Sequence, residues 1–347
     1  MRTLHVLSNR AGHNARVPRV SVFIPTYNRA KLLPHAIRGV LEQTFDDLRL
    51  VVSDNASEDE TQEVVASFDD PRIEYVRQPE NLGAFGNHNW FLTRVETDFA
   101  LILCDDDLVY PTLLERMVAE LDRRPRAGVV HAAFDVIDEE GEVLLPHVNW
   151  TNGLEHDAVE SPEEFIRESM RWSCRVCAST ALMRTTALPP GRMVQEDMPA
   201  SDFGLWLRTA AAGWEFAFLN DTLGAFRIHG LAHSAAFAIP QGPGYVHGTE
   251  IASHLKALKL RFLAQNDGRL ADVERLRRLA EEARRRELVV MARNLTLPER
   301  KPGPTFRALA HAVRADPAVL LGTPPWKLAA GSIVGRRAVE WLKARAG

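Results

Sequence analysis

The order of hydrophobic and polar positions predicts that strands and helices alternate over the first third of the chain. Four short runs are rich in β-branched or other apolar residues and are compact enough to be buried strands: residues 20–24, 48–53, 73–76 and 99–104. The segments between them, such as 30–43, carry apolar residues at helical spacing. Strands and helices in this order predict an α/β fold, with a mostly parallel sheet, right-handed crossovers and helices on both faces.

Beyond Pro111 the pattern continues with a second set of strands and helices. In chain order we expect a helix at 112–121, a hairpin of 128–137 with 142–145, a helix that begins at Ser161, and strands at 178–183, 215–219 and 223–229. Between these elements, residues 188–200 contain three prolines and are expected to form an irregular loop. A long loop beside a ligand pocket is a natural acceptor-binding element.

After Pro240 the pattern changes to that of long helices. Most of 249–294 has helical spacing, and the tail at 326–346 mixes basic residues with tryptophan and aliphatic residues. This tail is typical of an amphipathic helix that binds an anionic membrane surface, but it could also pack on the body of the chain or on another subunit. The organisation that we predict is a flexible arm, a main domain and a helical region: residues 1–19, 20–240 and 241–347.

Composition narrows the class of protein. Hydrophobic residues make up 46% of the 347 and charged residues 25%, as in soluble globular proteins. The formal net charge of −4 lacks the excess of basic residues that general nucleic-acid binding requires. The first residues lack a signal-like apolar stretch and no run is long enough to span a bilayer, so the sequence predicts a cytoplasmic protein. The three cysteines, which we interpret as reduced thiols, are Cys104, Cys174 and Cys177.

Polar loops follow three of the four predicted strands. Their residues are Thr26 and Tyr27 after the first strand, Asp54 after the second, and Asp105 to Asp107 after the fourth. Each could be structural, as a turn, a helix cap or an acidic helix start. Parallel strands would place all three loops at one edge of the sheet, which is where ligands bind in open α/β folds. This coincidence favours a site for a nucleotide, its phosphates and a hard divalent cation.

Together these segments resemble the family 2 glycosyltransferases, which have the GT-A fold. The matching segments, in family order, are Val-Phe-Ile-Pro-Thr-Tyr-Asn-Arg at 22–29, Val-Ser-Asp-Asn-Ala-Ser-Glu-Asp at 52–59, Asn-Leu-Gly at 81–83 and Cys-Asp-Asp-Asp at 104–107. The resemblance implies a Rossmann-like catalytic domain at 20–240, in which 20–111 would bind a nucleotide sugar and 112–240 the acceptor. The chain has neither a glycine-rich dinucleotide motif nor a P-loop lysine, which disfavours dehydrogenases and kinases.

The resemblance also implies which residues bind the donor nucleotide. Thr26 and Tyr27 would flank the base, and Asp54 would accept a hydrogen bond from the ring N–H of uracil or thymine. Asp105 would bind the ribose hydroxyls. With the other motif positions included, the expected nucleotide-binding residues are Pro25, Thr26, Tyr27, Arg29, Asp54, Asn89 and Asp105.

A divalent cation, Mn²⁺ or Mg²⁺, is implied as well, with Asp106 as its main ligand. His229 would be a second ligand and Asp107 a further candidate. The family often has aspartate where this chain has Cys104, which leaves open which neighbouring aspartate assists Asp106. His229 ends an Arg-x-His pair at 227–229 that resembles the closing motif of the family, although a lone histidine could also be structural.

Asp202 matches the general base of the family, in a segment where Ser201 replaces the usual glutamate. The residues alone would also allow Asp202 to be a helix cap. A single base implies an inverting reaction, in which a sugar moves from a UDP- or dTDP-type donor to an acceptor nucleophile. The acceptor is not identified by the sequence: a saccharide, a lipid-linked glycan, a natural product and a peptide all remain open.

Two other functions remain open at this point. A sugar-1-phosphate nucleotidyltransferase also joins a nucleotide-binding core to metal-binding carboxylates, but it should have a glycine- and basic-rich loop where 25–29 read Pro-Thr-Tyr-Asn-Arg. The non-enzymatic alternative is a nucleotide-sugar-binding scaffold that acts through its C-terminal helices. Those helices could form a homo-oligomer or a peripheral contact with the inner face of the membrane, and no nucleic-acid partner is expected.

Overall fold

The computed structural model describes residues 6–7, 16–151, 154–172, 174–194, 197, 200–228 and 244–294. The chain forms two compact units, and each is described by itself. The first comprises 1–169 with 174–227, and the second comprises 170–173 with 228–347. His229 and the tail at 326–346, for which the sequence predicts roles, lie outside the described residues.

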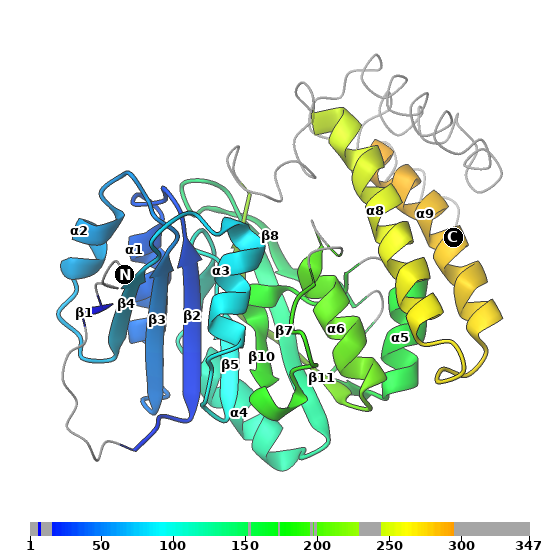
Figure 1. Ribbon diagram of the computed structural model, residues 1–347, viewed down its shortest axis with the longest axis horizontal. Coiled ribbons are helices and arrows are strands. Elements are labelled where there is room, and N and C mark those ends of the chain that lie inside the picture. The colour runs from blue at the N-terminus through cyan, green and yellow to red at the C-terminus, as the bar shows by residue number, and fades with distance from the viewer. Residues whose placement is uncertain are drawn as a thin grey trace, which may run out of the picture. The chain divides into compact units, whose positions relative to one another are not determined.

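The first unit is built on one sheet (Figure 1). Its first large strands are β2 (Val20–Thr26), β3 (Leu48–Asp54), β4 (Ile73–Arg77) and β5 (Phe99–Ile102). They are ordered β4-β3-β2-β5 and each neighbouring pair is parallel, which confirms the prediction for this half of the sheet. A short strand, β1 (Val6–Leu7), pairs antiparallel with β4 and lies within the stretch that we expected to be an arm.

The other half of the sheet is mixed, so the prediction of a mostly parallel sheet holds for β2 to β5 but not for the sheet as a whole. Here β10 (Ala181–Arg184) runs antiparallel between β5 and β7 (Ala127–Ile137), and β11 (Glu215–Arg227) lies parallel to β7. The predicted hairpin is confirmed, because β8 (Val143–Val148) pairs antiparallel with β7. Two further short strands, β6 (Leu108–Val109) and β9 (Ala158–Glu160), pair antiparallel with β11.

Two element predictions for this half were wrong. β11 is one strand where the pattern predicted two, because its register against β7 shifts between Leu219 and Thr222 and so keeps the polar residues within the strand. Residues 178–180 form a 3₁₀ turn, η1 (Ala178–Thr180), so the strand that we expected from 178 begins at Ala181.

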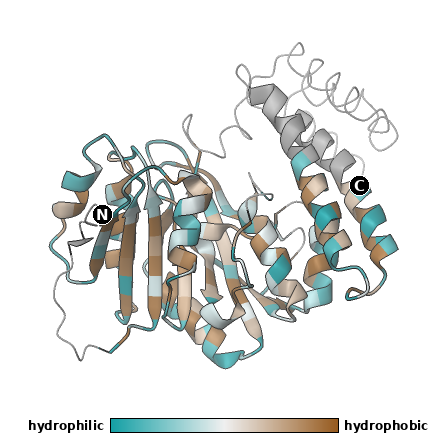
Figure 2. Ribbon diagram, in the orientation of Figure 1, coloured by the Kyte–Doolittle hydropathy of each residue, from teal (hydrophilic) through white to brown (hydrophobic). Residues whose placement is uncertain are grey.

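Helices cover both faces of the sheet, as predicted. The helices of this unit are α1 (Leu33–Leu41), α2 (Thr61–Ala66), α3 (Gly83–Leu92), α4 (Leu113–Arg123), α5 (Pro162–Arg171) and α6 (Ser201–Ala211). Alternate residues of β2 serve opposite faces. Val22 joins a buried cluster with Ile37 of α1 and Met117 of α4. Phe23 instead stacks on Phe91 of α3, with 4.4 Å between ring centroids. In Figure 1, α3 and α6 lie in front of the sheet, and Figure 2 shows its apolar strands in brown.

The described part of the second unit is a pair of packed helices. α8 (Gly244–Gln265) is followed by α9 (Val273–Asn294), and the turn between them includes Gly268 with a φ of +80°. Phe262, Leu263 and Ala280 are buried in this unit, and Lys256 of α8 forms an ion pair with Glu281 of α9. The helical character predicted after Pro240 is therefore confirmed over these residues, as two helices.

His131, on β7, is expected to make the stability of the protein depend on pH. The residue is 2% exposed, and its Nε2 has no hydrogen-bond partner in the described part of the chain. Burial, with a smaller effect from the charge of Arg175, lowers the pKa of the imidazole to about 3. An unfolded histidine titrates at about 6.5, so the unfolded state binds more protons below that pH and stability falls as the pH falls. Between pH 7 and pH 5, we expect His131 to lower the free energy of unfolding by about 2 kcal/mol.

Urea unfolding of the wild type and of His131→Leu at both pH values isolates this contribution. The difference between the two proteins should shift by the expected amount, whereas the titration of all other groups is common to both. The same pH dependence in the two proteins would show that His131 is not held neutral in the folded state.

Candidate active site

The carboxyl ends of the parallel strands meet at one edge of the sheet, as the sequence predicts. Pro25 and Thr26 are the last residues of β2, and Thr26 lies opposite Asp54 at the end of β3. On the other side of β2, the N–H of Leu103, just beyond β5, donates to the carbonyl of Phe23 at 2.9 Å. The polar loops that follow β2, β3 and β5 are therefore neighbours, and this edge is the candidate active site.

Asp54 ends β3 with a fully buried carboxylate that is bonded on both oxygens. Oδ1 accepts from the N–H of Ser57 at 2.7 Å, and Oδ2 accepts from the hydroxyl of Tyr75 and from Nη1 of Arg77, each at 2.6 Å. Both of these side chains come from β4, where Arg77 lies opposite Asp54 in register. Neither Tyr75 nor Arg77 was predicted from the sequence as a partner of Asp54. Aligning the predicted strands 48–53 and 73–76 in parallel could have suggested Arg77, because it lies opposite Asp54. The role of Asp54 in base recognition stays a prediction.

The loop after β2 is held against the loop after β3. Asn28 has a left-handed backbone conformation, with a φ of 54°, and its N–H donates to Oγ of Ser57 at 2.9 Å. This turn leaves Tyr27 42% exposed and brings the Arg29 guanidinium to 3.7 Å from Oδ2 of Asp106. Arg29 and Asp106, which the sequence assigns to the nucleotide and to the metal, are thus brought together.

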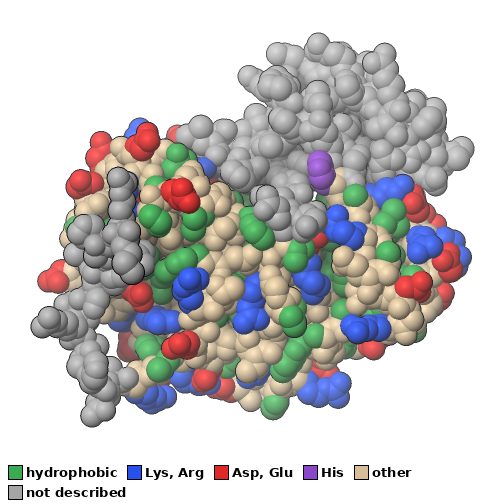
Figure 3. All heavy atoms as spheres, viewed as in Figure 1, with side chains coloured by type: hydrophobic (Ala, Val, Ile, Leu, Met, Phe, Trp, Pro, Cys, Tyr) green, Lys and Arg blue, Asp and Glu red, His purple; other side chains and the backbone are tan. Residues whose placement is uncertain are grey.

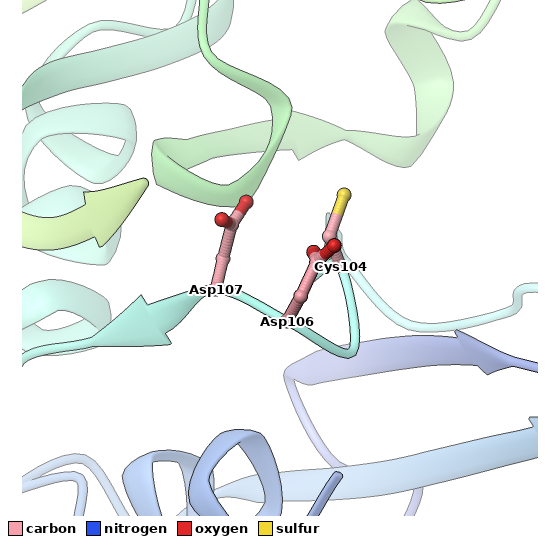
Figure 4. A group of neighbouring side chains, drawn as sticks. All are labelled: Cys104, Asp106 and Asp107. Carbon is pink, nitrogen blue, oxygen red and sulfur yellow. The ribbon is translucent and has the colours of Figure 1, made fainter. Parts of the chain in front are cut away.

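The acidic loop, residues 104–107, turns sharply after β5 (Figure 4). The Sγ atom of Cys104 and carboxylate oxygens of Asp106 and Asp107 all lie within 4.8 Å of one another. Asp107 is 2% exposed and firmly held: Ser179 donates its hydroxyl to Oδ2 at 2.5 Å, and the N–H of Arg227 donates to Oδ1 at 2.9 Å. Two carboxylates and a thiol this close together form a donor set that fits a divalent cation.

Burial and mutual repulsion make the acidic loop harder to ionise. Burial, and then the charge of Asp106, raises the pKa of Asp105 to about 7, and the charge of Arg29 and the backbone N–H of Tyr27 offset only part of this shift. Burial and the same neighbour also raise the pKa of Asp107 well above the usual range of a carboxyl group, despite the hydrogen bond from Ser179. Positive charge delivered to this loop would favour the ionised carboxylates.

Arg227 braces the acidic loop from β11. The residue is 3% exposed, and its guanidinium donates to the backbone carbonyls of Asp106, Asp138 and Glu139 at 2.8–2.9 Å. These bonds tie the acidic loop to the turn between β7 and β8. In the Arg-x-His pair that the sequence singled out, Arg227 therefore shapes the loop, and its partner His229 lies outside the described residues.

Asn89 links α3 to the loop that precedes α6. Its Nδ2 donates to the carbonyl of Met193 at 2.9 Å, and its Oδ1 accepts from the N–H of Met193 at 3.1 Å. Arg208 of α6 holds the same loop through an ion pair with Asp197, and Gly204 leaves the space that this carboxylate occupies. Both polar groups of the Asn89 side chain are thus used within the protein. Its contact with a nucleotide stays a prediction.

Asp202 lies in the first turn of α6, where the sequence predicts a helix start. Burial raises the pKa of its carboxyl group, while its own N–H and that of Phe203 oppose the shift. Sγ of Cys174 approaches Oδ2 of Asp202 at 4.0 Å. Burial, and then the charge of Asp107, raises the pKa of the Cys177 thiol. The segment from Cys174 to Ser179 therefore contacts Asp202 at one end and Asp107 at the other, so one region contains both the candidate base and a candidate metal ligand.

The surface of the described residues is mixed in charge on the face shown in Figure 3, where basic and acidic side chains are interspersed. On this face, the described residues form no continuous basic stripe. Among the described helices, none combines the length and the apolar character needed to cross a membrane.

Comparison with known sequences finds one family model that matches part of the chain. Residues 21–184 match the sequence model described as Glycosyl transferase family 2. Over 154 residues, the chain is 34% identical to the GalNAc(5)-diNAcBac-PP-undecaprenol beta-1,3-glucosyltransferase of Campylobacter jejuni. This match covers 43% of the chain and 48% of that protein, so the chain spans about half the length of this relative.

Two solved structures are similar in fold. The mannosyltransferase PcManGT from Pyrobaculum calidifontis, in complex with GDP-Man and Mn²⁺, has a TM-score of 0.58 at 20% identity, over 95% of this chain and 85% of that one. Residues 1–349 of TarS from S. aureus, in complex with UDP-GlcNAc, have a TM-score of 0.54 at 18% identity, over 87% and 90% of the two chains. At these identities the likeness concerns the fold alone.

Proposed function

We propose that this chain, which matches the family 2 glycosyltransferases over residues 21–184 and shares the GT-A fold, transfers a sugar from a nucleoside-diphosphate sugar to an acceptor nucleophile. The observation that carries the proposal is the meeting of three polar loops at one edge of the parallel strands. Asp54 lies opposite Thr26, and Arg29 lies 3.7 Å from Asp106. A nucleotide sugar requires this combination of a base pocket, carboxylates for a cation and a guanidinium for phosphate.

We propose a UDP- or dTDP-type donor. Oδ1 of Asp54, at the end of β3, accepts one hydrogen bond, from Ser57, among the described residues, and its second lone pair suits the ring N–H of uracil or thymine. Tyr27 is exposed enough to stack on a base. The two fold neighbours carry UDP-GlcNAc in one case and GDP-Man in the other. Fold alone therefore leaves the base open, and the proposal rests on the residues of this chain.

In the proposed mechanism, a hydroxyl oxygen of the acceptor attacks the anomeric carbon of the donor sugar, and Asp202 accepts the proton of that hydroxyl. Attack from the face opposite the diphosphate inverts that carbon. Asp106 and Asp107 would hold a divalent cation, Mn²⁺ or Mg²⁺, which when bound supplies Lewis-acid stabilisation of the leaving diphosphate. Arg29, beside Asp106, would bind the same phosphate oxygens through charge-assisted hydrogen bonds.

A lipid-linked saccharide is the acceptor class that we favour among those left open. The support is the name of the Campylobacter relative, which describes a saccharide on undecaprenol diphosphate. An acceptor of this kind would fit a cytoplasmic enzyme that contacts the inner membrane face through its C-terminal helices. Transfer to a water-soluble, short-chain prenyl-diphosphate saccharide would test the acceptor class directly.

The two alternative functions make different predictions. A nucleotidyltransferase would need a glycine-rich phosphate loop after β2, whereas the turn there is formed by Asn28 in a left-handed conformation. Such an enzyme would release pyrophosphate from a nucleoside triphosphate and a sugar phosphate. A scaffold would bind the nucleotide sugar but would not release nucleoside diphosphate when an acceptor is added.

Uridine diphosphate is expected to bind tightly only when a divalent cation is present, because the diphosphate would otherwise meet the carboxylates of the acidic loop. Calorimetry with UDP in Mn²⁺ and in a chelator measures this dependence. Asp106→Asn should lose most of the gain that Mn²⁺ provides. Asp69→Asn, which changes an exposed carboxylate before β4, is the matched control. Equal affinity of the wild type in chelator and in Mn²⁺ would show that the proposed metal dependence is wrong.

A further inference from the structure

The acidic loop holds a sulfur donor among its carboxylates. Sγ of Cys104 lies within 4.8 Å of the carboxylate oxygens of Asp106 and Asp107, and Figure 4 shows Cys104 beside Asp106 on one turn. We propose that Cys104 ligates the metal as a thiolate. Of the two ions named above, the site would therefore prefer Mn²⁺ to Mg²⁺, and it would also bind other transition metals such as Co²⁺ and Zn²⁺ in preference to Mg²⁺. This inference rests on the proposed function, because the ion is the one that would meet the leaving diphosphate.

One side chain, that of Ser179, holds two of the three residues that would bind the metal. The N–H of Cys104 donates to Oγ of Ser179 at 3.2 Å, and the same hydroxyl donates to Oδ2 of Asp107 at 2.5 Å. Ser179 belongs to η1, the 3₁₀ turn that precedes β10. The backbone of the cysteine and the carboxylate are thus held together from the opposite half of the sheet, and ordering them costs little when an ion binds.

The three donor atoms, which lie within 4.8 Å of one another, must move closer to share one ion. Zinc lies about 2.3 Å from sulfur and about 2.0–2.2 Å from carboxylate oxygen, so two ligands at its tetrahedral angle are about 3.5 Å apart. Asp106 is on the partly exposed side of the turn, with 15% of its side chain accessible, and rotation about its side-chain bonds would bring its carboxylate toward the other two donors. Oxygens of the nucleotide diphosphate and water would complete the coordination.

A sulfur ligand changes which ion the site prefers. Mg²⁺ demands oxygen ligands in near-ideal octahedral geometry, whereas thiolate sulfur favours zinc and the later transition metals. When the ion binds, the S–H bond of Cys104 breaks, a metal–sulfur bond forms and the proton leaves to water, with no change in oxidation state. A purely oxygen donor set at this place would instead accept Mg²⁺ readily.

The other two cysteines of the chain provide matched controls. Cys177 directly precedes η1 and is 5% exposed, and Cys174 has its Sγ 4.0 Å from Oδ2 of Asp202. Both are thiols of the same unit, and neither belongs to the donor group of the acidic loop among the described residues.

Cobalt gives a spectroscopic test that needs neither the sugar nor the acceptor. Co²⁺ is titrated into the full-length protein with UDP present, and the near-ultraviolet spectrum is recorded, since a cobalt–thiolate bond produces a charge-transfer band that oxygen ligands do not. We expect the band in the wild type and its loss in Cys104→Ser. Cys174→Ser and Cys177→Ser should retain it. Cys104→Asp, which replaces sulfur by a carboxylate, should bind Co²⁺ without the band. Its circular dichroism spectrum should match that of the wild type if the variant is folded.

Competition measures the selectivity separately. Excess Mg²⁺ should fail to displace Co²⁺ from the wild type but should displace it from Cys104→Asp, whereas Zn²⁺ should displace it from the wild type. If the wild type binds Co²⁺ without the band, Cys104 is not a thiolate ligand and the inference is wrong, but the metal site of the proposed function is unaffected. A band that survives in Cys104→Ser also overturns the inference. If no divalent cation alters the affinity for UDP, the proposed metal dependence itself fails, which is a distinct result.

Discussion

Replacement of Asp202 by asparagine is expected to lower the rate of sugar transfer by roughly 10²–10⁴-fold, the usual contribution of a general base. Asparagine keeps the size of the side chain and can still accept from the N–H groups at the start of α6. It cannot take a proton from the acceptor. Affinity for UDP and the melting temperature should therefore stay near those of the wild type. Single-turnover transfer, with calorimetry of UDP binding alongside, separates the chemical step from binding.

The same carboxylate should set the pH dependence of transfer. Burial raises the pKa of Asp202 above the ordinary aspartate value, and a general base acts only when ionised. The single-turnover rate should therefore rise with pH through this raised pKa and level off above it. Asp202→Asn should lose that rise and show a low, flat profile.

Ser201→Ala is the matched control for this experiment. Ser201 begins the same helix, and its hydroxyl lies 3.5 Å from the sulfur of Met193. The variant should transfer sugar at close to the wild-type rate. Full activity of Asp202→Asn would reduce Asp202 to a structural residue at a helix start. Loss of UDP binding in that variant would instead place its carboxylate among the groups that hold the nucleotide or the metal.

Replacement of Asp54 by alanine is expected to weaken both the fold and the binding of pyrimidine nucleotides. The buried carboxylate accepts hydrogen bonds from Ser57, Tyr75 and Arg77, so its removal should lower the free energy of unfolding by about 1–3 kcal/mol. The affinity for UDP should fall by a similar free energy, because the ring N–H of the base would lose its acceptor. Urea unfolding and calorimetry measure the two losses independently.

Tyr75→Phe distinguishes these two effects. It removes one hydrogen bond to Asp54 but keeps the carboxylate, so it should cost about 1 kcal/mol of stability and leave the preference for UDP over GDP unchanged. Asp54→Ala should lower that preference. Tighter binding of GDP than of UDP by the wild type would contradict the proposed pyrimidine donor.

Local sequence determined the elements and the position of the candidate site. The runs at 20–24 and 48–53 became β2 and β3, and the polar residues after them lie where the strands end. The start of α5 was also local, since the sequence predicts a helix that begins at Ser161. The N–H of Glu164 donates to the Ser161 hydroxyl at 3.3 Å, and the N–H of Ser161 donates to the Glu164 carboxylate at 3.1 Å, which is a capping box. These features depend on residue type and on spacing within a few residues, and both can be read along the chain.

Tertiary structure decided which groups each functional side chain contacts. Arg77 reaches Asp54 only because β3 and β4 pair in a particular register. Met193 is 104 residues from Asn89, and Arg227 is 120 residues from Asp107, yet each pair is hydrogen-bonded. A buried polar group bonds with whichever partner the packed chain brings within about 3 Å. That partner depends on strand register and on the packing of distant segments, which no local pattern encodes. The sequence alone therefore placed the carboxylates at the edge of the sheet, and the folded chain determined how each is held.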